Sequence, residues 1–219
     1  MSLRVVVEVT PKKAFASAID WPGWSRGAKT DELALQALLD YAPRYVAVAK
    51  RGKVAFAPPK TLRGLDVVER LDGDASTEFG IPAADVSADE EPLTPAELKR
   101  QLGLLEAAWK AFDAAARKAE GVSLRLGPRG GGRQVPKIIE HVTGADEGYL
   151  RALGAKPPAD GASSQAIRRA FVAALTSRAT GQPLADPNKV RKPWSPRYAI
   201  RRSAWHALDH AWEIEDRAG

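Results

Sequence analysis

The first half of the chain alternates between strand-like and helix-like spacing of its apolar residues. Leu3 to Val9 is rich in valine and predicts a strand, and Ala14 to Asp20 predicts its hairpin partner. Thr30 and the acidic turn that follows it predict the start of a helix. Helical spacing continues across Pro43, which favours a kinked continuation, although the valine-rich stretch after it also suits a short strand. Residues 66–71 predict one more strand.

The second half has apolar stripes of helical period in four successive segments. Thr94-Pro95-Ala96-Glu97 has the residue types of a helix start, because threonine caps the end, proline fits the first turn and glutamate returns a hydrogen bond. Four amphipathic helices with connections of this size predict a four-helix bundle. The predicted helices span residues 95 to about 121, about 135 to 154, 164 to about 180 and 196 to about 217.

Charge differs between the two halves. Residues 1–94 carry 12 Lys/Arg and 14 Asp/Glu, and the remainder carries 21 and 13, so a net of −2 is followed by a net of +8. Together with the prolines and the acidic run in residues 82–95, this contrast predicts two domains, residues 1–88 and 95–219, joined by an exposed connector. The expected fold class is α+β, a small αβ domain followed by an all-α bundle.

Composition restricts the cellular location and the kinds of metal site and cross-link that the chain can have. The chain has no cysteine, which excludes disulfides and cysteine-ligated zinc. Met1 to Thr10 resembles a strand and not a signal peptide, and no apolar run is long enough to span a bilayer. We therefore expect a cytoplasmic protein without a membrane partner.

All three histidines of the chain lie where one metal ion could bind them. His206 and His210 are four positions apart on the last predicted helix, so their imidazoles lie on one face. His141 lies on the second predicted helix of the bundle. Three imidazole ligands leave at least one coordination position for water or substrate, as in catalytic zinc sites. The alternative is that each histidine is a core residue bonded to a backbone carbonyl.

Three carboxylates lie close to these histidines in the sequence. Glu213 follows His210 by three residues, on the same face, and is the candidate general base, with a solvated surface charge as the alternative. Asp209 is a candidate to orient an imidazole. Glu140 is expected to be a surface charge, because it points about 100° away from His141.

The basic surplus of the second half includes Arg197, Arg201 and Arg202, just before the histidine pair. These charges would attract a small anionic substrate or a thiol, unless they only form a solvated face. We do not expect nucleic-acid binding, because the sequence lacks a basic stripe with interleaved aromatic residues. Trp21 and Trp24 are expected to form a contact surface or to pack against the second domain. A homodimer is compatible with the sequence.

The second half resembles the DinB family of four-helix bundles, which includes thiol-dependent transferases. The resemblance rests on a histidine within Ile138-Ile139-Glu140-His141-Val142 and on the His-x-x-x-His pair at positions 206 and 210. It implies that His141, His206 and His210 bind a divalent metal ion, usually zinc or nickel, and that a low-molecular-weight thiol is a candidate cofactor. The Arg-Gly-Gln that often follows the last histidine in the family is replaced here by Ala-Trp-Glu, so no particular substrate is implied.

The first half is similar to the HicB-like antitoxin fold. The matching features are a strand pair, the loop Trp21-Pro22-Gly23-Trp24, and Lys29-Thr30-Asp31-Glu32 opening a helix. HicB proteins join this module to a DNA-binding tail, and no such tail is visible here, so we expect a structural or recognition role.

These features predict a metal-dependent enzyme that acts on a small molecule by hydrolysis or thiol transfer. The alternative is a non-catalytic interaction or stress-related protein whose metal ion stabilises the bundle.

Overall fold

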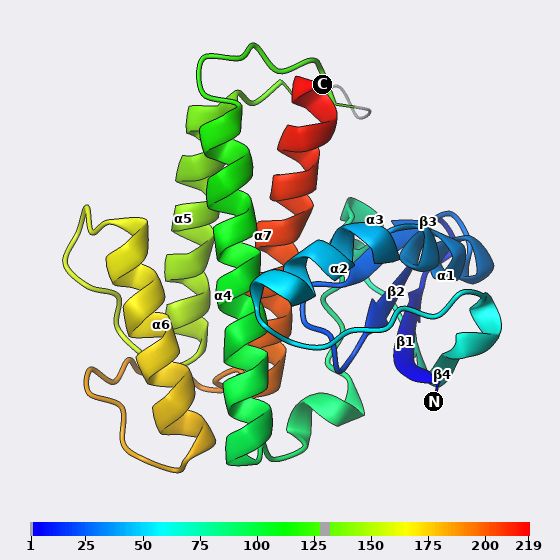
Figure 1. The fold of residues 1–219 in the computed structure, drawn as a ribbon. Coiled ribbons are helices and arrows are strands. Elements are labelled where there is room, and N and C mark those ends of the chain that lie inside the picture. Colours follow the sequence, from blue (N-terminus) through cyan, green and yellow to red (C-terminus); the bar gives the residue numbers. More distant parts are fainter. Residues whose placement is uncertain (1, 128–131) are drawn as a thin grey trace.

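The computed structural model describes residues 2–127 and 132–219 and has a mixed α+β fold, as predicted (Figure 1). A small four-stranded sheet lies in the N-terminal part, and long helices follow. The N-terminal elements are β1 (Leu3–Val9), β2 (Ala14–Ala18), β3 (Ser25–Ala28), α1 (Asp31–Asp40), α2 (Ala42–Arg51), the 3₁₀ helix η1 (Leu62–Gly64), β4 (Leu65–Asp72) and α3 (Ala75–Phe79). The 3₁₀ helix η2 (Ser87–Glu90), α4 (Pro95–Lys118), α5 (Val135–Ala152), α6 (Ser164–Ala179) and α7 (Pro196–Ala218) complete the chain.

The sheet has the strand order β3-β2-β1-β4. The predicted hairpin of β1 and β2 is confirmed, and β4 pairs parallel to β1 on its other side. A register shift between Val5 and Val6 leaves Val68 of β4 without a partner on β1. The strand β3 was not predicted, because Ser25–Ala28 has no alternation of apolar and polar residues and is held in place by its pairing with β2.

The helical continuation past Pro43 is confirmed, and the strand alternative is wrong. Thr30 caps α1 as predicted, its side chain accepting a hydrogen bond from the backbone of Leu33. The kink is a full break, since α1 ends before Tyr41 and α2 starts with Pro43 in its first turn. Proline has no N–H to donate, so it fits the start of a helix better than its interior.

The tryptophan loop packs inward. Trp24 is buried, stacks on Tyr45 with ring centroids 5.6 Å apart, and donates its Nε1–H to the carbonyl of Leu38 at 2.8 Å. Gly23 between the tryptophans has φ of +91°, and a Cβ there would lie 2.7 Å from Leu208 of α7. Trp24 is therefore not part of a contact surface and packs within the first half. Packing against the second half is confirmed for Gly23 and for the partly buried Trp21, whose ring lies 5.0 Å from the Arg100 guanidinium of α4.

The segment between the two halves differs from the prediction of an exposed connector, because part of it is buried. Val86 and Asp89 are 2% and 4% exposed. Asp89 forms an ion pair with Arg201 of α7 at 2.5 Å, and Arg201 also donates to the carbonyl of Ala84 at 3.2 Å. A buried guanidinium needs such partners, which explains why part of an acidic run lies inside the protein. A single hydrophobic core contains residues from both halves, including Val5 and Leu208, so the proposed boundary does not divide the core.

The four long helices α4 to α7 lie side by side next to the sheet (Figure 1). Their bounds agree with the sequence-based expectation, and the predicted start signal is present, with the Thr94 side chain accepting from the backbone of Glu97 and the Glu97 carboxylate accepting in return. Among the described residues, no helix is both long and apolar enough to cross a membrane. Helix α7 contacts α4, α5 and η2, and its Trp205 meets Phe15 of β2 edge to face with ring centroids 6.4 Å apart.

Candidate metal centre

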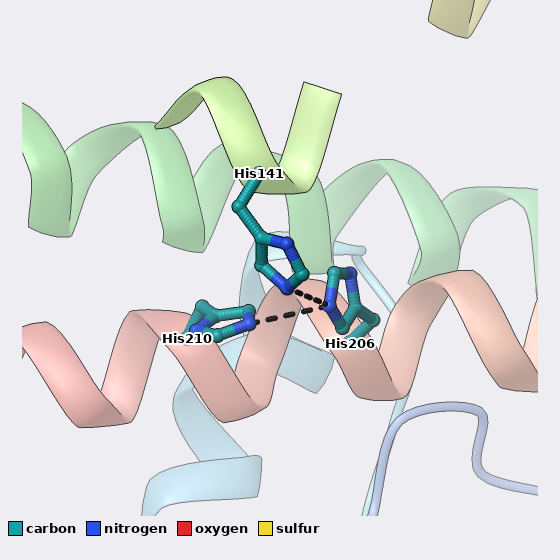
Figure 2. A group of neighbouring side chains, drawn as sticks. All are labelled: His141, His206 and His210. Carbon is teal, nitrogen blue, oxygen red and sulfur yellow. Dashed lines mark hydrogen bonds between the residues drawn. The ribbon is translucent and has the colours of Figure 1, made fainter. Parts of the chain in front are cut away.

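The three histidines converge between α5 and α7 (Figure 2). The Nε2 atom of His206 lies 3.1 Å from Nε2 of His141 and 3.2 Å from Nε2 of His210. The spacing of four residues places His206 and His210 on one face of α7, and the packing of α5 against α7 brings His141 to the same point. The predicted meeting of the three side chains is therefore present.

The donor set fits a divalent cation. Tetrahedral zinc with Zn–N bonds of about 2.0–2.1 Å places its nitrogen ligands about 3.3–3.4 Å apart. The two Nε2–Nε2 distances of 3.1 and 3.2 Å are close to this value. In addition, the Nδ1 atom of His210 faces a carboxylate and so carries its proton there, which leaves a lone pair on Nε2. Lone pairs on neighbouring imidazole nitrogens repel each other, and a cation bound between them would remove this repulsion.

Glu213 holds His210 in this orientation. Its Oε2 atom lies 2.7 Å from His210 Nδ1, and its Oε1 atom accepts from Arg217 Nη1 at 2.5 Å. Arg217 is itself fixed, because it donates to the carbonyls of Arg125 and Arg133 at 2.6 and 2.8 Å. Both carboxylate oxygens are thus engaged away from the point where the three Nε2 atoms meet. The geometry favours a positioning role for Glu213, and its role as a general base stays a prediction.

Charge and burial shift the pKa values of His141, His206 and Glu213 in the direction that favours metal binding. Burial acts to raise the pKa of Glu213, but its hydrogen bond to His210 and its contact with Arg217 outweigh burial and lower the pKa overall. Burial lowers the pKa of His141, and it lowers the pKa of His206 further, with help from the charges of His210 and Arg202. A metal ion binds the neutral imidazole and the carboxylate partner must be ionised, so these shifts favour binding.

The other two carboxylates lie away from the site. Asp209 pairs with Arg26 of β3 at 3.3 Å, so the expectation that it orients an imidazole is wrong. Glu140 is exposed and pairs with Lys137 at 2.6 Å, which confirms that it is a surface charge.

The three arginines before the histidine pair are buried, so a solvated basic face is ruled out for them. Arg197 pairs with Glu97 at 3.2 Å and donates to the carbonyls of residues 91 and 92. Arg201 pairs with Asp89. Within residues 2–127 and 132–219, Arg202 has no such carboxylate, and it lies beside Tyr149 of α5, whose ring is also 5.8 Å from the ring of His206. Sequence reasoning missed Tyr149, since an isolated tyrosine on an amphipathic helix gives no signal of a site.

The resemblances described above rest on the histidine pattern and on the order of the predicted elements. Comparison of the chain with family models, with curated proteins and with solved structures found no match.

Proposed function

We propose that this chain is a metal-dependent enzyme acting on a small molecule, with a DinB-like four-helix bundle formed by α4 to α7 and one zinc or nickel ion held by His141, His206 and His210. The supporting observation is the meeting of three Nε2 atoms from two helices, with Glu213 orienting one of them. Three neutral imidazoles side by side gain little from one another, so a shared cation would explain why they meet.

The residues at this centre would have two roles, binding the ion and orienting one of its ligands. The three imidazoles would hold the ion and leave coordination positions free, and Glu213 and Arg217 keep His210 turned toward it. A bound divalent ion lowers the pKa of a coordinated water or thiol and polarises a carbonyl group. Both hydrolysis and thiol transfer need this chemistry, so the substrate is proposed to be a small molecule with either a hydrolysable bond or a thiol acceptor group. We also propose that the protein uses a low-molecular-weight thiol as cofactor and acts in the cytoplasm.

Metal analysis tests the proposal directly. The purified chain is expected to hold about one zinc or nickel ion per molecule, and the variant H206A/H210A is expected to hold none. The matched control is E140A, which removes an exposed carboxylate next to His141 and should keep the full metal content. Stoichiometric metal in H206A/H210A would contradict the site.

A second candidate is a non-catalytic protein in which the ion joins α5 to α7. It is favoured by the burial of His206, which is 7% exposed, because structural ions are usually enclosed. The burial of Trp24 argues against it, since this side chain was a candidate for its contact surface. Removal of the metal with a chelator separates the two. A large fall in melting temperature without turnover of any thiol or ester supports the structural role. The enzyme is supported if the metal-free protein stays folded and if added thiols bind the ion of the metal-loaded protein.

A further inference from the structure

Arg202 is a buried cation without a carboxylate partner. It lies on α7 one helical turn before His206, on the face of the helix that carries the histidine pair. The residue is 8% exposed, and its Nη1 atom has no hydrogen-bond partner among residues 2–127 and 132–219. A guanidinium removed from water in this way is destabilising unless something compensates its charge.

The other buried arginines show what compensation looks like in this protein. Each has at least one carboxylate within ion-pair distance among the described residues. The pairs are Arg168 with Asp113 and Asp146, Arg197 with Glu97, Arg201 with Asp89, and Arg217 with Glu213. Arg202 forms none of these pairs, although its neighbour Arg201 does, so its lack of a partner is a local property and not a general feature of α7.

Aromatic rings surround the guanidinium without using its N–H groups. The Arg202 Cζ atom lies 4.7 Å from the ring centroid of Trp205 and 5.4 Å from that of Tyr149. Such contacts stabilise the charge, but a ring face does not accept the planar set of N–H donors as a carboxylate does. The Tyr149 ring also contacts His206, so the free donors lie in the same region as the metal ligands.

The carboxylates close to Arg202 along the chain or across the site are engaged by other groups. Asp146 accepts from Ser203, the residue after Arg202, and pairs with Arg168, while Glu213 is engaged by His210 and Arg217. The charges of Arg202 and Arg133 act on His206 in the same direction, and a divalent ion would add to them. The missing partner is therefore an anion that comes from outside the chain.

We propose that Arg202 binds the carboxylate of a small-molecule substrate whose other end occupies an open coordination position of the metal ion. A carboxylate matches the planar donor fork of arginine in a bidentate geometry. This inference rests on the proposed function and deepens it, because it names the substrate class as a carboxylate carrying a second, metal-binding group. Arg202 acts as a binding and specificity residue, and the reacting bond lies at the metal.

The experiment compares two thiols on the cobalt(II)-loaded chain. The first, 4-mercaptobutyrate, has a thiol and a carboxylate that are too far apart to close a five-membered chelate ring on the cobalt ion, and the second, 4-mercaptobutan-1-ol, has the same thiol group and no charge. Binding of either thiolate to cobalt is followed by its ligand-to-metal absorption band. The wild-type chain is expected to bind 4-mercaptobutyrate about 10- to 100-fold more tightly, which corresponds to a charged hydrogen-bond pair. The variant R202Q is expected to bind both thiols with nearly equal affinity.

The control is R191Q, which removes the same charge from an exposed position in the loop before α7 and should keep the preference. Failure to bind cobalt would overturn the metal site and this assignment together. Cobalt binding with equal affinity for the two thiols in the wild-type chain would overturn the role of Arg202 alone, whether or not R202Q folds. A preference that survives in R202Q would overturn it as well. The variant R202M adds an independent measurement, because removal of an unpaired buried charge is expected to raise the melting temperature of the metal-free protein.

Discussion

The carboxylate of Glu213 lies 2.7 Å from Nδ1 of His210, so the outer nitrogen of one metal-ligand candidate is fixed by a residue one turn further along the same helix. Arg217, one turn further again, holds the other oxygen of that carboxylate. The three side chains form a row on α7 that ends at the candidate metal centre. Each of these contacts along α7 joins residues only three or four positions apart.

The first prediction concerns metal affinity. The variant E213A is expected to bind zinc about 10- to 100-fold more weakly than the wild-type chain, because His210 loses the partner that orients its ring and favours the Nδ1–H tautomer. Competition with a chromophoric chelator measures this change. The matched control E140A removes an exposed carboxylate and should leave the affinity unchanged. An unchanged affinity in E213A would remove Glu213 from the site.

The second prediction concerns the ion pair between Asp89 and Arg201. Their side chains are 4% and 5% exposed, so D89A leaves a buried charge without a partner and is expected to lower the free energy of unfolding by about 3–5 kcal/mol. The matched control is D85A, which breaks the exposed pair with Lys192 and should change stability by less than about 1 kcal/mol. Urea unfolding measures both. Equal effects would mean that the segment before α4 is not packed as described.

The third prediction concerns pH. Burial raises the pKa of Asp146 to about 6, against the opposing effects of Arg168 and Ser203. The folded state therefore holds this proton more tightly than the unfolded state, whose pKa is about 4. The contribution of Asp146 to stability is fully present below about pH 4 and is lost as the pH rises to about 6, by about 3 kcal/mol. The variant D146N lacks this titration.

This effect is tested by measuring the free energy of unfolding of the wild type and of D146N in chelator at several pH values. The titration of all other groups is common to the two proteins and cancels in the difference between them. The stability of D146N relative to the wild type is expected to rise by about 3 kcal/mol between pH 4 and pH 7. A difference that stays constant over this range would mean that Asp146 keeps an ordinary pKa in the folded protein.

The fourth prediction concerns Gly23. The variant G23A is expected to lower stability by about 1–3 kcal/mol, because alanine is strained at a φ of +91° and its Cβ would lie 2.7 Å from Leu208. Gly148 supplies the control, since it lies in α5 with no atom within 4 Å of an added Cβ. G148A is expected to raise stability by about 0.5–1 kcal/mol through its higher helix propensity. Loss of stability in both variants would contradict this comparison.

Features that depend on neighbouring residues were predicted well from the sequence. Thr30 and Thr94 cap helices as expected, since a cap involves only the next few residues. The histidine pair of α7 follows from helical geometry alone. The burial of Arg197, Arg201 and Arg202 was not predictable. The carboxylates that pair with the first two, Glu97 and Asp89, lie about a hundred positions away, and no local pattern connects them to α7. The strand β3 was missed for the same reason, as it is defined by its neighbour β2.

The position of Trp205 gives the centre a built-in optical signal. Its indole is next to His206 in the chain, lies over the Arg202 guanidinium and touches Phe15 of the sheet. Indole emission depends on nearby charge, so loading the three imidazoles with an ion should change the fluorescence of this one side chain. Titration could then be followed on the unlabelled protein, with Trp205→Phe as the silent reference.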